Sequence, residues 1–202
     1  MATLQSHRKY SKADLAVQVP TALVEHQTIE QTMERLPKGT RRLAAQLRTP
    51  INQDEIWEVL TDYNKLSDFI PNLASSKLIK RRNNKVELKQ VGSQKLIGFN
   101  FTAQVHIELE ENKNNGELRF HLVKGDFRRF EGAWKMQSIS EYGTRLLYEL
   151  TVQGCIGMPV GLIEQRLRDD LKANLLAVEK EVLRRQSLNT KNQDLSYKAH
   201  KE

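Results

Sequence analysis

A long amphipathic helix near the C-terminus constrains the fold of this sequence more than any other feature. Pro159 opens it, at a position where the missing N–H of proline costs nothing. Apolar residues then recur at spacings of three and four: Val160, Ile163, Leu167, Leu171, Leu175, Val178 and Val182. If it continues to about Gln186, the helix is ~42 Å long, which exceeds the reach of a small flat sheet. The stripe therefore predicts a sheet that curls around the helix.

The chain before this helix has the alternation of antiparallel strands. Apolar residues alternate with polar ones throughout residues 99–110, and Asn83-Asn84 and Asn114-Asn115-Gly116 are typical hairpin turns. Residues 41–48 predict an earlier strand, which two short helices follow, the first with Asn52 as its N-cap and Glu55 in the capping-box position. We therefore predict an α+β domain with seven antiparallel strands, two short helices after the first strand, and a long final helix.

The two ends of the chain lack such patterns. Residues 1–40 are polar and interrupted by Pro20, Pro37 and Gly39, so we expect a largely irregular extension, with at most a short helix in residues 22–36. Residues 187–202 are polar and unpatterned, and we expect a disordered tail. The domain itself is assigned to residues 41–186.

Composition limits the class of protein. The chain has 202 residues, which suits one domain, and no apolar run approaches the ~20 residues of a membrane-spanning helix. The first residues lack the apolar core of a secretory signal, so we expect a cytoplasmic protein, at most peripheral to a membrane. The single cysteine, Cys155, excludes an internal disulfide, and its place at the end of an apolar strand favours a small core residue.

Three segments resemble a known family. Residues 56–63 (IWEVLTDY) and 66–72 (LSDFIPN) resemble the opening of the polyketide cyclase/dehydrase branch of the START-like superfamily, and residues 123–134 resemble a later stretch of the same branch. Residues 158–166 are similar to a cyanobacterial and plastid subgroup. The branch includes coenzyme Q-binding proteins and bacterial ribosome-association toxins. The resemblance covers residues 41–186 and implies the helix-grip fold, a curved sheet around a long helix, in proteins that mostly bind or transfer ligands.

Large apolar side chains share the strand faces that this fold turns toward the helix. They are Phe99, Phe101, Phe120, Phe130, Trp134, Met136 and Tyr148, and the helix opposes them with Ile163, Leu167 and Leu171. A filled core explains any one of them, but the resemblance implies a gap beside the N-terminal half of the helix. We expect the set to line a cavity for a hydrophobic small molecule, such as a lipid, an isoprenoid or a quinone-like compound.

Polar groups accompany this set. Tyr148, Gln90 and Arg42 fall at or near the expected cavity. A buried phenol needs a hydrogen-bond partner, so the Tyr148 hydroxyl either orients a ligand or bonds a backbone carbonyl.

Six basic residues gather on and around one predicted hairpin. They are Lys77, Lys80, Arg81, Arg82, Lys85 and Lys89, in a chain of net charge +7. These charges either protect an edge strand from aggregation or form a docking patch for an anionic membrane, or for a ribosome or RNA. Proteins that read RNA usually add exposed aromatic residues for stacking, and this hairpin has none.

The sequence offers no catalytic set. Its histidines do not cluster, and His106 falls on the polar face of its strand. We find no Ser-His-Asp arrangement, metal-ligand spacing or phosphate-binding loop, and we expect neither metal nor cofactor. The sequence favours non-catalytic binding. It leaves two alternatives, a protein or ribosome interaction module without a small ligand and, less favoured, a cyclase or dehydratase; it does not determine the oligomeric state.

Overall fold

The computed structural model describes residues 29–96, 99–140, 143–155 and 160–199, with backbone alone at 94–96, 99–100, 140, 160–163 and 192–199. The elements in chain order are β1 (Glu30–Arg35), η1 (Pro37–Gly39), β2 (Arg41–Thr49), α1 (Gln53–Thr61), η2 (Tyr63–Lys65), α2 (Leu66–Phe69), β3 (Leu73–Arg82), β4 (Lys85–Leu96), β5 (Phe99–Asn112), η3 (Lys113–Asn115), β6 (Glu117–Gly125), β7 (Phe127–Ser140), β8 (Gly143–Gly154) and α3 (Val160–Ala199).

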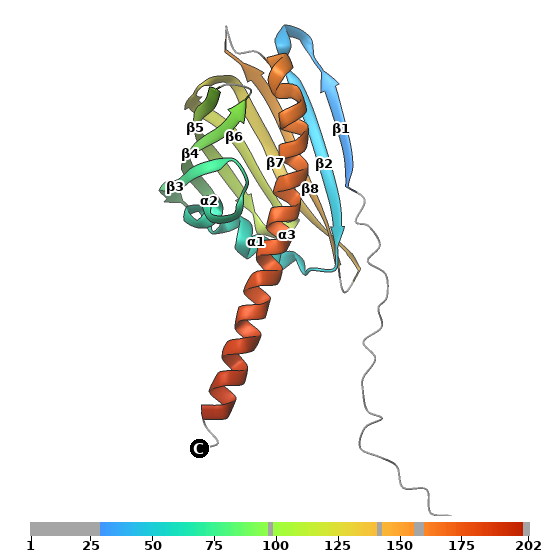
Figure 1. Cartoon of the computed structure of the whole chain (residues 1–202), viewed down its shortest axis with the longest axis vertical. Helices are drawn as coiled ribbons and strands as arrows, with labels where there is room; N and C mark the ends of the chain where they lie inside the picture. The colour runs from blue at the N-terminus through green and yellow to red at the C-terminus, as the bar shows by residue number, and fades with distance from the viewer. Residues whose placement is uncertain (1–28, 97–98, 141–142, 156–159, 200–202) are drawn as a thin grey trace, which may run out of the picture.

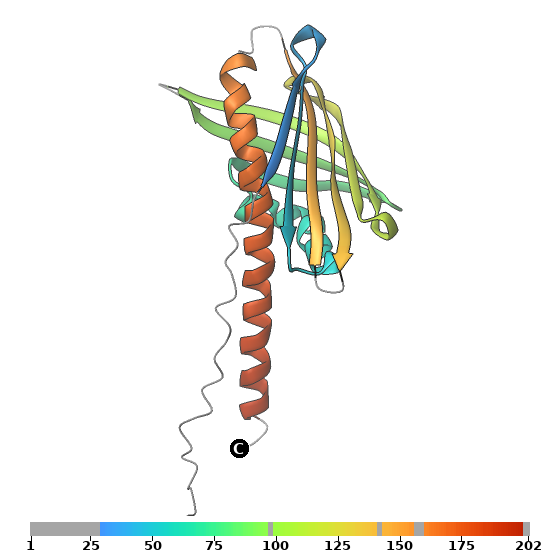
Figure 2. The same ribbon diagram turned by 90° about the vertical axis from the view of Figure 1, so that its right-hand side faces the viewer.

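The strands form one antiparallel sheet with α3 in its concave face. The strand order is β1-β2-β8-β7-β6-β5-β4-β3. In Figure 2 the sheet twists so strongly that β3 to β5 cross the direction of β2 and β8, and α3 runs along the hollow. The buried residues of α3 include Leu171, Leu175, Val178 and Val182, which confirms the apolar stripe. The α+β class and the curved sheet around a long helix are therefore confirmed.

The number of strands differs from the prediction. The sheet has eight strands because β1 pairs with β2 in a segment that we expected to be irregular or weakly helical. On β1 the side chains of Gln31 and Met33 are only half-buried, and its other residues are exposed. An edge strand with one neighbour is held mainly by its backbone ladder, so it leaves little apolar alternation in the sequence.

The helix α3 also runs further than predicted. It continues to Ala199, through most of the segment that we expected to be a disordered tail. Residues 187–199 contain neither glycine nor proline, so nothing in them breaks a helix once it has begun. At 1.5 Å per residue the whole helix is ~60 Å long, and Figure 1 shows its C-terminal part extending beyond the sheet. No helix within the described ranges is both long and apolar enough to cross a membrane.

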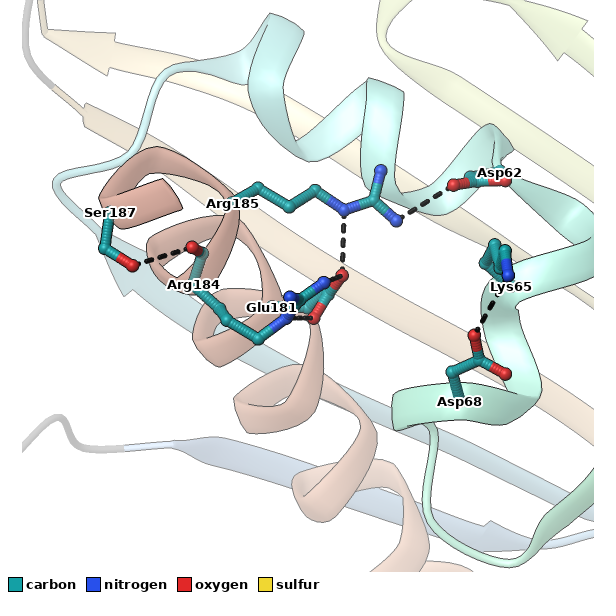
Figure 3. A network of polar contacts seen from close by, with 7 residues as sticks. All are labelled: Asp62, Lys65, Asp68, Glu181, Arg184, Arg185 and Ser187. Atoms are coloured by element: carbon teal, nitrogen blue, oxygen red, sulfur yellow. Dashed lines mark hydrogen bonds and ion pairs between the residues drawn. The ribbon is translucent and has the colours of Figure 1, made fainter. Parts of the chain in front are cut away.

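Two polar clusters fix α3 along its length. Near its start, the buried Glu164 accepts hydrogen bonds from Arg35 on β1 (2.7 Å) and Arg41 on β2 (2.9 Å). Further along, the Glu181 carboxylate accepts from Arg184 and Arg185, and Arg185 also bonds Asp62 beside η2 at 3.0 Å (Figure 3). These hydrogen bonds lower the pKa of both Glu164 and Glu181 to about 2. The helix is thus anchored on either side of the segment that faces the centre of the sheet.

A local signal in the sequence explains where the short helix α1 begins. The Asn52 side chain caps α1 by accepting from the backbone N–H of Asp54 at 2.8 Å, as predicted. In place of the predicted capping-box contact, the Glu55 carboxylate accepts a hydrogen bond from Gln186 of α3 at 2.8 Å.

The position of Cys155 differs from the prediction, because we expected this residue in the core. It is exposed, because β8 ends at Gly154 and the cysteine follows the last strand residue.

Candidate ligand cavity

A cavity of about 220 Å³ lies between α3 and the sheet. Its walls come from β5, β7, β8 and α3, and the segment after α2 closes one side together with the adjoining ends of β3 and β4. The lining residues are Ile70, Pro71, Asn72, Leu73, Gln90, Gly92, Ser93, Phe101, Ala103, Val105, Phe127, Phe130, Trp134, Tyr148, Leu150, Leu167, Asp170, Leu171 and Asn174. The volume is below the usual range for drug-sized ligands, but it exceeds the ~150 Å³ that accommodates benzene in an engineered cavity.

Aromatic rings form one wall of this cavity. Trp134 on β7 lies directly opposite Tyr148 on β8 in the strand register, and their rings stack with 4.0 Å between centroids and 3° between planes. Phe127 and Phe130 stack with centroids 5.5 Å apart. Such pairs hold each other in fixed orientations, so the wall is largely preformed.

The opposite wall comes from one face of α3. Leu167, Leu171 and Asn174 follow at spacings of four and three, which places them on the same side of a helix. The two leucines belong to the apolar stripe that the sequence predicted. Residues that are far apart in the sequence, on α3 and on the strands, therefore line the same cavity.

Six of the ten residues expected to line the cavity do so. They are Phe101, Phe130, Trp134, Tyr148, Leu167 and Leu171. The side chains of Phe99 and Ile163 lie outside the described part of the structure. Gln90 also lines the cavity, whereas Arg42 lies on the outer face and pairs with Glu34 at 3.1 Å.

Phe120 and Met136 belong to the packed core beside the cavity. Phe120 is 4% exposed, and its ring lies 5.6 Å from that of Phe130 and 6.4 Å from that of Tyr148. A Cβ atom at Gly132 would come within 2.9 Å of the Phe120 ring, so the ring covers the backbone of β7 at this glycine. Met136, two residues beyond Trp134, is 2% exposed.

The sequence did not predict most of the polar residues of the cavity. Asp170 accepts a hydrogen bond from Asn72 at 2.9 Å, and the Oδ1 atom of Asn174 is buried without a hydrogen-bond partner among the described residues. The sequence did contain a signal for Asn174, because this polar residue lies within an otherwise apolar helical stripe. Burial and the nearby Asp170 carboxylate raise the pKa of Tyr148, which keeps its hydroxyl protonated.

The basic residues lie elsewhere. β3 and β4 form the predicted hairpin, with Asn83 at a φ of 52°, and all six basic side chains are exposed. Three of them pair with carboxylates: Arg81 with Glu111, Lys85 with Glu108, and Lys80 with Glu87. Leu73 and Gly92 line the cavity from the opposite end of the hairpin, so none of the six basic residues contributes to it.

The histidines of the domain also lie outside the cavity. His106 pairs with Glu87 at 3.1 Å, and His121 is exposed on β6. Among the residues that the structure describes, no group of three or more His, Cys, Asp or Glu side chains is placed to hold a metal ion.

Comparison of the sequence with known proteins identifies one family. The model of a family described as "Polyketide cyclase / dehydrase and lipid transport" matches residues 49–179. The sequence has no significant match among curated proteins.

Several solved structures share the fold. A protein of Thermus thermophilus is 23% identical, with 70% of this chain and 97% of that chain covered and a TM-score of 0.62. The Zhui aromatase/cyclase of Streptomyces sp. R1128 is 15% identical, with 72% and 95% covered and a TM-score of 0.63. A STAR-related lipid transfer protein of Xanthomonas axonopodis is 19% identical, with 75% and 98% covered and a TM-score of 0.59. At these identities the likeness shows the fold alone.

Proposed function

The chain belongs to the polyketide cyclase / dehydrase and lipid transport family, as its sequence resemblance predicted, and we propose that it binds a hydrophobic small molecule without transforming it. The ligand is lipid-like, isoprenoid or quinone-like, and the site is the cavity between α3 and the sheet. The observation that carries this proposal is the pairing of a stacked aromatic wall, Trp134 on Tyr148, with an aliphatic wall on α3 across 220 Å³ of space.

The size and character of the cavity fit weak to moderate binding of an apolar group. A ligand that buries about 200 Å² of apolar surface gains about 5 kcal/mol from the hydrophobic effect. Lost translational and rotational freedom offsets part of this gain, while the preformed walls reduce the cost of ordering side chains. A larger ligand would place one apolar group in the cavity and leave the rest outside.

The test is native mass spectrometry of the full chain purified from its own host, followed by solvent extraction. We expect a bound apolar species that the solvent removes. A Leu167→Trp variant, which fills the cavity with an indole, should carry much less of it. Protein that carries no such species and binds no added apolar compound would contradict the proposal.

A second candidate is a cyclase or dehydratase that acts in the same cavity. The specific observation in its favour is the protonated phenol of Tyr148 close to the Asp170 carboxylate, in a mainly apolar space. Such a phenol can donate a proton or a hydrogen bond to a reacting carbonyl. Turnover of a polyketide-like substrate that is lost in Tyr148→Phe, with substrate binding retained, would favour this candidate over a carrier.

A carrier also has to acquire its ligand, and we propose that the β3–β4 hairpin docks on an anionic membrane. β3 is an edge strand that exposes Leu78 (36%) and Ile79 (53%) beside the basic side chains. Lys77, Arg82 and Lys89 form no ion pair with any described residue, so their charges are available to lipid headgroups. Exposed apolar residues among basic ones are suited to contact with a lipid surface.

A further inference from the structure

Two hydrogen-bonding groups of the cavity wall have no partner in the described part of the protein. The first is the hydroxyl of Tyr148, a residue that is 8% exposed. Its ring is held by the stack on Trp134, so the hydroxyl cannot turn to solvent without breaking that stack. Buried tyrosine hydroxyls ordinarily have a hydrogen-bond partner, and here a ligand is placed to supply it.

The second group is the side-chain amide of Asn174. It lines the cavity beside Leu171, which is buried on the same face of α3. Its Oδ1 atom is covered by protein and accepts no hydrogen bond from any described residue. Because Asn174 lines the cavity and its Oδ1 is covered, we infer that the Nδ2 end of the amide faces the cavity. An amide in an apolar helical stripe is unfavourable for packing, and a ligand contact would account for it.

The two groups lie at the same part of the cavity. Asp170 and Asn174 are four residues apart and so are neighbours on one face of α3. The Asp170 carboxylate is near enough to Tyr148 to act on its hydroxyl electrostatically. Asp170 accepts a hydrogen bond from Asn72, which ties α3 to the segment after α2 and encloses this part of the cavity.

We propose that the cavity selects an apolar ligand with a carbonyl oxygen, which accepts hydrogen bonds from the Tyr148 hydroxyl and the Asn174 amide. This inference rests on the proposed function and specifies the ligand class. The rest of the ligand contacts Phe101, Phe130 and Leu167. The volume, between one and two times that of the engineered benzene cavity, fits a group of one or two rings.

Three compounds of one bicyclic shape test the inference: tetralin without a polar group, 1-tetralone with a carbonyl, and 1-tetralol with a hydroxyl. Each is titrated by calorimetry into the full-length wild type, Tyr148→Phe and Asn174→Leu. Tyr148→Phe removes only the hydroxyl and keeps the stacked ring, and Asn174→Leu keeps the branched shape of the side chain without its polar atoms. Tyr63→Phe is the matched control, because Tyr63 bonds Glu111 at 2.6 Å and does not line the cavity.

The expected result concerns the ratio of 1-tetralone affinity to tetralin affinity. Tyr148→Phe and Asn174→Leu should each lower this ratio about fivefold, which is the equivalent of one hydrogen bond. The affinity for tetralin should remain nearly unchanged in both. Tyr63→Phe should leave the ratio as in wild type. Thermal unfolding of each variant checks that it is folded.

Four outcomes would count against the inference or against the proposed function on which it rests. A ratio that neither variant changes would show that Tyr148 and Asn174 do not recognise the carbonyl. A preference for 1-tetralol over 1-tetralone that depends on Asn174 would assign the amide to a hydrogen-bond donor instead. Failure of all three compounds to bind the wild type would contradict the proposed function itself, whereas equal binding of tetralin and 1-tetralone in every variant contradicts this inference alone.

Discussion

Trp134 and Tyr148 face each other across β7 and β8 with their rings nearly parallel, 4.0 Å apart between centroids. Both rings line the cavity. The stack places the indole of Trp134 beside the phenol of Tyr148, which we propose as a ligand contact. The fluorescence of an indole depends on its surroundings. Occupancy of the cavity should therefore be visible in the fluorescence of one tryptophan.

The first prediction uses the fact that the chain has only two tryptophans. Trp57 lies in α1 and does not line the cavity. Addition of 1-tetralone should change the emission of wild type and of Trp57→Phe in the same concentration range. Trp134→Phe should show no such change. A response that follows Trp57 instead would place the ligand outside this cavity.

The second prediction separates packed core from cavity wall by stability. Phe120→Ala should lower the free energy of unfolding by about 3–5 kcal/mol, the usual cost of emptying a well-packed site. Phe127→Ala removes an equal volume from a half-buried side chain that borders the cavity, so its cost should be clearly smaller. Urea denaturation measures both. Equal costs would mean that Phe120 and Phe127 are equally well packed, and that our distinction between core and wall is wrong.

The third prediction concerns acid stability. Hydrogen bonds from Arg35 and Arg41 lower the pKa of Glu164 to about 2 in the folded protein, against 4.5 as its ordinary value. The unfolded chain therefore binds this proton at a higher pH than the folded chain. The stabilisation is complete above pH 4.5 and is lost as the pH falls from 4.5 toward 2.

Glu164→Gln should accordingly be less stable than wild type at pH 7, and the difference should shrink through that window. The matched control is Glu34→Gln, because Glu34 forms an exposed ion pair with Arg42 and such pairs contribute little. Denaturation midpoints between pH 7 and pH 2.5 provide the measurement. A difference between Glu164→Gln and wild type that is constant across this range would rule out the ion cluster as its cause.

The fourth prediction addresses the hairpin. Lys77→Glu, Arg82→Glu and Lys89→Glu together should reduce binding to phosphatidylserine-containing vesicles at low salt, since each basic group near such a surface contributes about 1 kcal/mol. Reversal of Arg128, Lys124 and Lys172, which are exposed elsewhere, gives a control with the same change in net charge. Wild type that ignores these vesicles would end the docking proposal. Binding to RNA in the same assay would favour the ribosome alternative.

The sequence predicted most of the fold because its periodic patterns are long. The stripe from Leu167 to Val182 predicts a helix and the alternation in β5 predicts a strand. Each pattern also indicates which face of the element is buried. The pattern fails at β1, where Gln31 and Met33 carry too little apolar character to mark a strand. The same patterns predicted which face Phe101, Trp134 and Tyr148 share, and the structure brings these residues together.

Periodicity could not predict how densely that shared face is packed. Phe120 and Phe130 occupy equivalent positions in their alternating patterns, yet only Phe130 lines the cavity. The Phe120 ring packs against β7 at Gly132, where a Cβ atom would come within 2.9 Å of it, and alternation does not reveal such a contact. Asn174 is different, since its place in an apolar stripe could have been recognised from the sequence as a polar group that needs a partner.

The central claim, that the space between α3 and the sheet binds an apolar molecule, is tested most directly by calorimetric titration of tetralin into wild type and Leu167→Trp. Leu183→Trp is the control, because Leu183 is 50% exposed on α3 and is not part of the cavity. We predict that wild type and Leu183→Trp bind tetralin, while Leu167→Trp stays folded and binds at least tenfold more weakly. Absence of binding to wild type, together with a loss of about 1–3 kcal/mol of stability from overpacking in Leu167→Trp, would contradict the account and identify the space as part of a closed core.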